Sequence, residues 1–146
     1  MKPGLDFIGV GVGAILVNSD GKVFLSKRGP LAKNERGKWE IPGGALEFGE
    51  TFEQAIIRET FEEFGIKIKV KKLLHLTDHI LPDEKQHWVA PSYICEIVEG
   101  TPSIMEPGKT DEIGWFTLDE AEKLPLSVVT RKDIEVLKKT MLDLGI

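Results

Sequence analysis

The 146-residue chain has the length of one compact domain with its own core, and we expect a single domain over residues 1–146. Its composition, 41% hydrophobic and 29% charged, excludes a disordered chain, and no apolar run approaches the ~18 residues that span a bilayer. The net charge of −5 comes without a basic stripe, which argues against a nucleic-acid polymer as partner.

The start of the chain and its cysteine content indicate a location. Residues 1–4 do not lead into a signal-peptide pattern, because glycines interrupt the apolar segment that follows. The single cysteine, Cys95, cannot form an internal disulfide, so a reducing cytoplasm is the expected location, away from membranes. Cys95 stands in a strand-like run, where packing in the core is favoured over a role as a nucleophile.

The first predicted elements are strands. Residues 7–17 are predicted to form a strand in which Gly9, Gly11 and Gly13 alternate with apolar residues. No helix follows directly, so close backbone approach within a sheet is favoured over a phosphate-binding loop. Residues 18–21 are typical of a hairpin turn, and residues 22–27 are predicted to return as the paired strand.

The remaining elements alternate in type. A loop over residues 28–38 is followed by a short strand, 39–41, and a helix, 51–64, with Thr51 and Gln54 as a capping box and Gly65 as its left-handed stop. Strands are predicted over residues 66–80, 87–97 and 112–116, and helices over 118–123 and 127–144. This order predicts a mixed α/β (α+β) fold, with a mixed sheet between helices.

The helix over residues 51–64 carries an unusual charge pattern. Six glutamates and one arginine fall between residues 44 and 66, so this segment carries a charge of −5 and the rest of the chain is neutral. Glu59, Glu62 and Glu63 are spaced i, i+3 and i+4 and leave the helix within an arc of about 100°. The opposite sector is predicted to pack against the sheet; it comprises Ile56, Ile57, Thr60, Phe61 and Phe64.

A charge cluster is often only a solvated helix face, but this one opposes helix stability. Like charges at this spacing repel, and the helix dipole disfavours anions in the second half of the helix. Oxygen ligands of this kind suit Mg²⁺ or Mn²⁺, which keep several waters and bridge to substrate phosphates. Gly43 and Gly44 allow a tight turn, so that a carbonyl can face the same cation and N–H groups can face phosphate oxygens.

These residues resemble the nudix box, Gly-x5-Glu-x7-Arg-Glu-U-x-Glu-Glu-x-Gly-U, where U is a bulky aliphatic residue. The match covers 23 of the 146 residues and comprises Gly44, Glu50, Arg58, Glu59, Glu62, Glu63, Gly65 and Ile66. Thr60 stands where the aliphatic residue is usual, and we expect it to change helix packing rather than chemistry. The order of the elements resembles the nudix α/β/α sandwich over most of the chain.

The resemblance implies an enzyme that uses Mg²⁺ (or Mn²⁺) to cleave a phosphoanhydride bond in a nucleoside diphosphate derivative. Glu59 and Glu63 would be the main metal ligands, Glu62 would contribute directly or through water, and the Gly43 carbonyl would complete the set. Glu59 is also similar to the family's general base, which with Arg58 orients or deprotonates the attacking water. Members differ on which glutamate or loop residue does this.

Further segments, at residues 9–13, 26–28, 46–51, 58–60 and 106–115, resemble a narrower group, the MutT-like nucleoside triphosphate diphosphatases. This resemblance implies hydrolysis of a purine or oxidised-purine (d)NTP to the monophosphate and pyrophosphate. By that match Arg28 would contact phosphates, as the N–H groups at Gly44 can by their backbone turn, and Trp115 would stack on the base. Trp115 also fits a core or dimer anchor, and Arg28 an ordinary surface residue.

Other interpretations stay open. ADP-ribose hydrolysis is the runner-up, because Pro82 lies about 16 residues past the box, near a proline of ADP-ribose members, although aromatic neighbours are missing. A non-catalytic nudix-fold binding module is disfavoured because all the acidic residues are present. His75, His79 and His87 lack the compact spacing of a zinc site, so structural histidines are favoured. The family also implies a small-molecule nucleotide as partner, and a homodimer.

Overall fold

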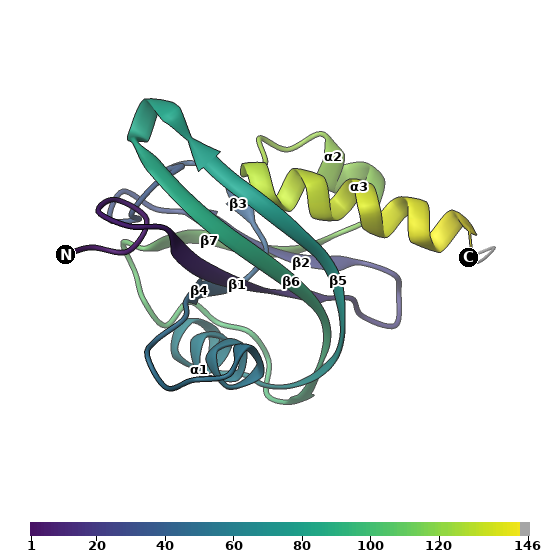
Figure 1. Ribbon diagram of the computed structural model, residues 1–146. Helices are drawn as coiled ribbons and strands as arrows, with labels where there is room; N and C mark the ends of the chain where they lie inside the picture. Colours follow the sequence, from purple (N-terminus) through teal and green to yellow (C-terminus); the bar gives the residue numbers. More distant parts are fainter. Residues whose placement is uncertain (144–146) are drawn as a thin grey trace.

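The computed structural model describes residues 1–143, which form two β-sheets and three α-helices (Figure 1). The four-stranded sheet has the order β4-β1-β6-β5, from β1 (Gly9–Leu16), β4 (Gly43–Ala45), β5 (Lys67–Leu81) and β6 (Gln86–Glu99). The three-stranded sheet has the order β3-β2-β7, from β2 (Val23–Arg28), β3 (Trp39–Glu40) and β7 (Thr110–Phe116). The helices are α1 (Phe52–Phe64), α2 (Leu118–Glu122) and α3 (Val128–Asp143), with a 3-10 turn η1 (Pro82–Glu84).

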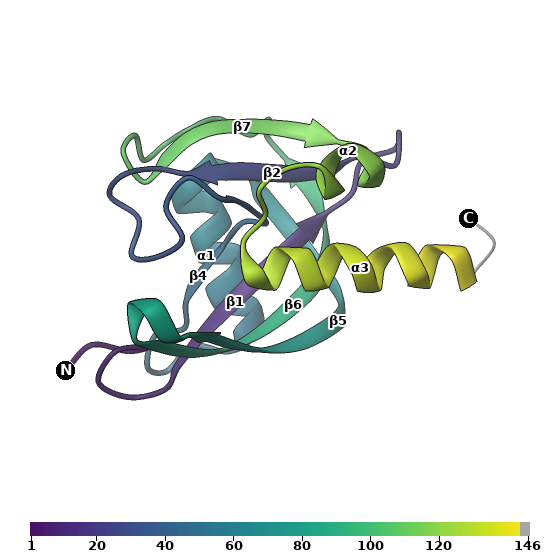
Figure 2. The ribbon, with the colours of Figure 1, turned by 90° about the horizontal axis from the view of Figure 1, so that it is seen from above.

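The helices cover the four-stranded sheet from both sides, with α1 on one face and α3 on the other (Figures 1 and 2). The sheet is mixed, because β1 runs parallel to β6 and antiparallel to β4. Successive side chains of β1 point to opposite faces, so Val12, Ala14 and Leu16 pack with α1 while Ile15 packs with α3. The predicted fold class, a mixed sheet between helices, is confirmed. Residue 144, the expected end of the last helix, lies outside the described residues.

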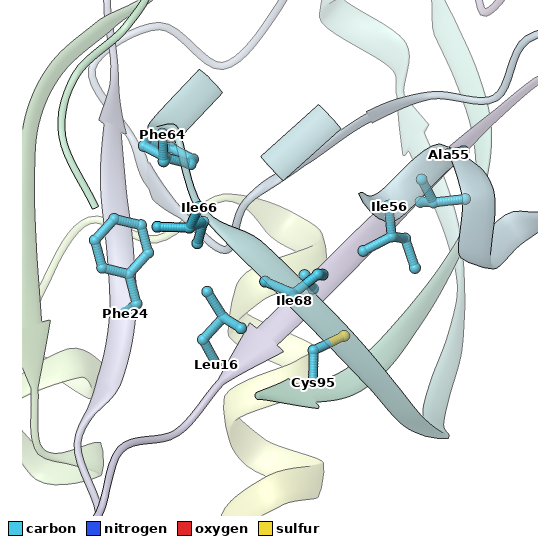
Figure 3. Packing of buried hydrophobic residues seen from close by; sticks show 10 residues of the cluster. Leu16, Phe24, Ala55, Ile56, Phe64, Ile66, Ile68 and Cys95 are labelled. Carbon is cyan, nitrogen blue, oxygen red and sulfur yellow. The ribbon is translucent and has the colours of Figure 1, made fainter. Parts of the chain in front are cut away.

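The core on the α1 side joins residues from distant parts of the chain (Figure 3). Phe24 of β2 and Phe64 of α1 meet edge to face, with ring centroids 5.1 Å apart. Cys95 of β6 is buried in the same cluster, and burial raises the pKa of its thiol to about 12. The thiol therefore stays protonated at neutral pH, and the prediction that Cys95 is a core residue is confirmed.

The predicted pairing of the first two strands is wrong. β1 and β2 belong to different sheets and share only an isolated bridge between Val17 and Val23. β6 pairs along one edge of β1 from Gly9 to Leu16, and β4 pairs with Gly11–Gly13 on the other edge, so β2 has no free edge over that part of the strand. β4 was not predicted either, since Gly43 and Gly44 were expected to form a tight turn after the strand over residues 39–41.

The chain forms α1 as its local pattern predicts. Thr51 accepts a hydrogen bond from the N–H of Gln54, the Gln54 side chain accepts one from the Thr51 N–H, and Gly65 ends the helix at φ 70°. Thr60 is fully buried and donates its hydroxyl to the Ile56 carbonyl (2.9 Å), so it faces the core as expected.

The predicted apolar sector of α1 is narrower than expected. Ile56, Thr60 and Phe64, spaced by four residues, are buried, but Ile57 and Phe61 are 41% and 53% exposed. The helix rests on the sheet along this i, i+4, i+8 row together with Ala55, and the row of Ile57 and Phe61 stays in solvent. None of the helices within residues 1–143 combines the length and apolar character that crossing a bilayer requires.

Candidate active site

A cavity of about 300 Å³ opens where α1, β4 and the loop before β7 meet β1 and β6. Six glutamates line it. We call four of them the glutamate cluster, because the charges of the other three act on Glu63: Glu40 of β3, Glu59 and Glu63 of α1, and Glu106 of the loop between β6 and β7. Glu40 and Glu106 are functional candidates that the sequence did not reveal, because nothing in the local pattern brings them to α1.

Glu63 is the most strongly perturbed member of the cluster. Burial raises its pKa well above the usual range, and the charges of Glu40, Glu59 and Glu106 raise it further. Its Oε1 atom is buried without a hydrogen-bond partner. A buried, unpartnered carboxylate oxygen among like charges is costly, and a divalent cation would relieve both the missing partner and the repulsion.

The donor set fits a hard divalent cation such as Mg²⁺. Within residues 1–143, no group of three or more His, Cys, Asp or Glu side chains is arranged to hold a metal ion. Mg²⁺ does not require one, since it is commonly held by one or two carboxylates, with waters and substrate oxygens as the other ligands. The protein ligands can come from Glu59, Glu63 and the backbone of Gly43, which all border the cavity.

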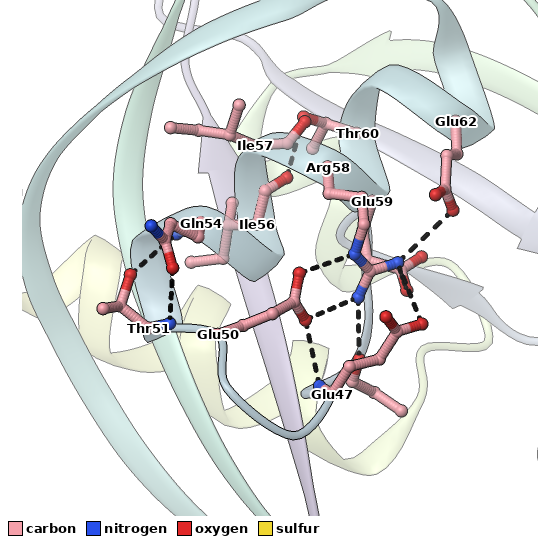
Figure 4. A network of polar contacts seen from close by, with 11 residues as sticks. Glu47, Glu50, Thr51, Gln54, Ile56, Ile57, Arg58, Glu59, Thr60 and Glu62 are labelled. Carbon is pink, nitrogen blue, oxygen red and sulfur yellow. Dashed lines mark hydrogen bonds and ion pairs between the residues drawn. The ribbon is translucent and has the colours of Figure 1, made fainter.

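Arg58 positions Glu59 through a network of ion pairs (Figure 4). Its Nε and Nη2 donate to the two carboxylate oxygens of Glu50 at 2.7 and 2.8 Å, and Nη1 donates to Glu59 Oε1 at 2.9 Å. These bonds lower the pKa of Glu50 to about 2, so Glu50 remains ionised and anchors the guanidinium. Burial raises the pKa of Glu59, while Arg58 opposes that rise.

The structure separates Glu62 from its two neighbours. Glu59 and Glu63 line the cavity, whereas the Glu62 side chain is 50% exposed, lies outside the lining and reaches only Arg58, at 3.4 Å. Glu62 and Glu63 are separated by about 100° of rotation around the helix axis, so the Glu62 side chain points away from the cavity. A direct role for Glu62 at the metal stays a prediction.

Gly44 lies against the Glu59 carboxylate, and a Cβ atom there would overlap it. We expect Gly44→Ala to displace Glu59 and to lower kcat/KM by about 10²-fold, since a displacement of about 1 Å at a reacting group has that cost. The melting temperature should change little, because a side-chain end can move aside. Steady-state kinetics and a thermal melt test this expectation, and unchanged kinetics would contradict it.

A second polar group borders the cavity away from α1. Arg28 donates to Glu40 Oε2 and to the Asn34 carbonyl, both at 2.7 Å. Burial raises the pKa of Glu40, and Arg28 opposes that rise. Arg28 therefore lies at the cavity, as its predicted role requires, but both contacts are within the protein; phosphate binding by Arg28 stays a prediction.

Glu35 links the loop between β2 and β3 to β5 and to the start of α3. Its carboxylate contacts His79 Nε2 at 2.7 Å and accepts a hydrogen bond from the Val128 N–H, at the start of α3, at 2.8 Å. Burial alone would raise the pKa of Glu35, but these bonds outweigh it and the pKa lies below the usual value. His79 is thus part of an internal pair, the structural role favoured for it.

Trp115 and Trp88 lie in different environments, and base stacking by Trp115 stays a prediction. Trp115 packs on Phe24 in the core, with ring centroids 5.3 Å apart, and does not line the cavity. This placement supports a packing role for Trp115, because the face of β7 that carries it packs on the core beneath α1. The tryptophan that does line the cavity is Trp88, on β6, which no sequence motif marked.

A family model described as NUDIX domain matches residues 8–137, which include the cavity-lining elements of both sheets and α1. The chain belongs to the NUDIX family. The match agrees with the box at Gly44–Ile66 and confirms the family predicted from it.

Similar proteins place this NUDIX chain near MutT. A crystal structure of a MutT NUDIX hydrolase from Burkholderia pseudomallei is 39% identical, with a TM-score of 0.83, covering 90% of this chain and 99% of that one. An ADP-ribose pyrophosphatase from Methanocaldococcus jannaschii is 33% identical over 75% of this chain and 62% of its own length. An 8-oxo-dGTP diphosphatase from Proteus vulgaris is 42% identical over 47% of this chain and 61% of its own. The matched regions thus span about three fifths of these two relatives.

Proposed function

We propose that this NUDIX protein is a Mg²⁺-dependent hydrolase that cleaves a phosphoanhydride bond in a nucleoside diphosphate derivative. The first candidate substrate is a purine or oxidised-purine (d)NTP, converted to the monophosphate and pyrophosphate. The observation that carries the proposal is the buried, unpartnered oxygen of Glu63 within the glutamate cluster. Membership of the family and the similarity to MutT support it.

NUDIX hydrolases generally use a divalent metal. Glu59, Glu63 and the Gly43 carbonyl would hold it here, and Mn²⁺ is the alternative to Mg²⁺. Once bound, the ion supplies charge neutralisation for the phosphates and a lower pKa for the attacking water.

The chain's own residues would orient and deprotonate the water. Glu59 would accept the proton. Arg58, fixed by Glu50, holds Glu59 in one orientation. The water oxygen bonds to phosphorus, the bridging P–O bond breaks, and its electron pair leaves with pyrophosphate; no covalent enzyme intermediate is needed.

ADP-ribose hydrolysis is the second candidate. It is favoured by the relative from Methanocaldococcus jannaschii, which is named an ADP-ribose pyrophosphatase. A binding module without catalysis is disfavoured, because Glu59 and Glu63 are retained and border a cavity. A homodimer stays a prediction, which light scattering of the purified protein would check.

A substrate panel with Mg²⁺ separates these candidates. The panel contains dGTP, 8-oxo-dGTP, dCTP, ADP-ribose, a diadenosine polyphosphate and GDP-mannose, with products identified by chromatography. Monophosphate plus pyrophosphate would support the first candidate, and AMP plus ribose 5-phosphate the second. If no compound is hydrolysed although one binds tightly, the catalytic proposal fails in favour of the binding module. Activity should vanish with EDTA and return with Mg²⁺.

A further inference from the structure

The segment between β3 and β4 passes from one sheet to the other. Glu40, at the end of β3, pairs with β2 of the three-stranded sheet, whereas Gly43, at the start of β4, pairs with β1 of the four-stranded sheet. Ile41 and Pro42 make this crossing, so they connect a member of the glutamate cluster to the glycine whose carbonyl is expected to bind the metal. The position of the Ile41 backbone therefore affects where Glu40 and Gly43 lie relative to each other.

The start of α3 holds this crossing through a buried hydrogen bond. The Ile41 N–H donates to Thr130 Oγ1 at 3.0 Å, and both residues are buried. Ser127 Oγ donates to the same Thr130 oxygen at 2.9 Å, which orients the hydroxyl. Because Ile41 belongs to neither sheet, its N–H has no partner in a strand among residues 1–143, and Thr130 supplies the acceptor that a buried donor requires.

The side chain of Ile41 is fixed as well. A Cβ atom on Gly13 of β1 would lie 2.6 Å from Ile41 Cδ1, so the isoleucine packs closely on the backbone of that strand. Nearby, the Trp39 carbonyl of β3 accepts a hydrogen bond from the Ser127 N–H at 2.9 Å, so β3 also contacts the start of α3. The backbone of Ile41 is thus held between β1 and α3, and Thr130 is the α3 residue that bonds to it.

We propose that Thr130 is a positioning residue for the metal site: its hydroxyl holds the Ile41 backbone and thereby sets Gly43 and Glu40 against the two glutamates of α1. Thr130 acts through Ile41 and not on the reacting atoms. Residues that orient metal ligands from behind in this way commonly contribute about 10- to 100-fold to metal affinity or activity. The inference rests on the proposed function, because it takes the Gly43 carbonyl as a metal ligand. It extends that function to α3, a helix that supplies none of the expected ligands.

The test compares two substitutions at Thr130. Thr130→Val keeps the shape of the side chain but removes the acceptor of the Ile41 N–H, whereas Thr130→Ser keeps the hydroxyl. Thr140→Val is the matched control, because the Thr140 hydroxyl donates within the same helix, to the Val136 carbonyl at 2.8 Å. Each protein is titrated with Mn²⁺ alone, with the free ion followed by electron paramagnetic resonance. The kcat/KM with Mg²⁺ is measured well below the melting temperature, which a thermal melt provides.

We expect Thr130→Val to bind Mn²⁺ about tenfold more weakly than wild type and to lose at least about tenfold in kcat/KM. Thr130→Ser and Thr140→Val should stay within about twofold of wild type in both quantities. A lower melting temperature of Thr130→Val with unchanged Mn²⁺ affinity and kcat/KM would show a purely structural role and overturn the inference, as would equal losses in Thr130→Ser.

If Thr130→Val does not fold, Thr130→Ala takes its place under the same criteria, since the smaller side chain leaves room for a water at the Ile41 N–H. The proposed function is judged separately, by the wild-type protein. Wild type that binds no Mn²⁺ would refute the proposed function and the inference together, whereas Mn²⁺ binding that is equal in wild type and Thr130→Val would refute the inference alone.

Discussion

Glu63→Gln is expected to lower kcat by about 10³-fold or more, which corresponds to about 4 kcal/mol of barrier height. The glutamine has the shape of glutamate, but its neutral amide cannot replace a carboxylate as a ligand for a hard cation. The fold should survive, because Glu63 is buried beside three other carboxylates and the substitution removes repulsion. The melting temperature of the metal-free variant should therefore equal or exceed that of wild type.

Glu53→Gln is the control for this experiment. Glu53 lies in the first turn of the same helix, is exposed and does not line the cavity, so the same change of charge there should leave kcat within about twofold. Kinetics with Mg²⁺ and calorimetric titration of the metal into both variants provide the measurements. Full Mg²⁺-dependent activity in Glu63→Gln would show that the site has been assigned to the wrong residues.

Asp133→Asn is expected to remove a large pH dependence of stability. Asp133 of α3 is 1% exposed, its Oδ2 lies 2.6 Å from Ser92 Oγ, and its Oδ1 has no partner. Burial raises the pKa of Asp133 from 3.8 to about 7, although the bond with Ser92 opposes the rise. Between these values the unfolded chain loses the proton that the folded protein keeps, so the free energy of unfolding falls as the pH rises.

Each pKa unit corresponds to 1.36 kcal/mol, so the shift of Asp133 amounts to about 4 kcal/mol, fully lost above pH 7. An asparagine has no such titration. The difference in unfolding free energy between Asp133→Asn and wild type should therefore grow in favour of the variant between about pH 4 and pH 7, and then level off. Urea unfolding at several pH values measures it, with Glu135→Gln, exposed on the same helix, as control. Parallel pH profiles for Asp133→Asn and wild type would contradict the expectation.

The region around α1 was predictable because its signals are local. The capping box of Thr51 and Gln54, the left-handed Gly65 and the common side of Glu59 and Glu63 depend only on residues within a few positions of one another. The same local reasoning predicted that Ile57 and Phe61 pack against the sheet, but both side chains are exposed. How wide a face a helix buries is set by the surface on which it packs, and the periodicity alone does not contain that surface.

The pairing of strands was harder to predict, because competing partners decide it. The turn after residue 17 is typical of a hairpin, but β6 and β4 occupy the edges of β1, and β2 pairs with β3 and β7 instead. The alternating glycines of β1 were interpreted as a place of close approach. That interpretation holds for Gly9 and Gly13, which meet Trp88 and Ile41, but Gly11 adjoins open space.

By itself the sequence determined the family, the helix with its ion-pairing arginine and two of the glutamates that face the cavity, because a nudix box is a short segment whose geometry follows from helical spacing. Only the tertiary structure decided that Glu40 and Glu106 join these glutamates, that Glu62 faces away, and that Trp88 rather than Trp115 borders the cavity. These residues come from separate strands and a loop. Their meeting depends on the packing of two sheets, which no local spacing encodes.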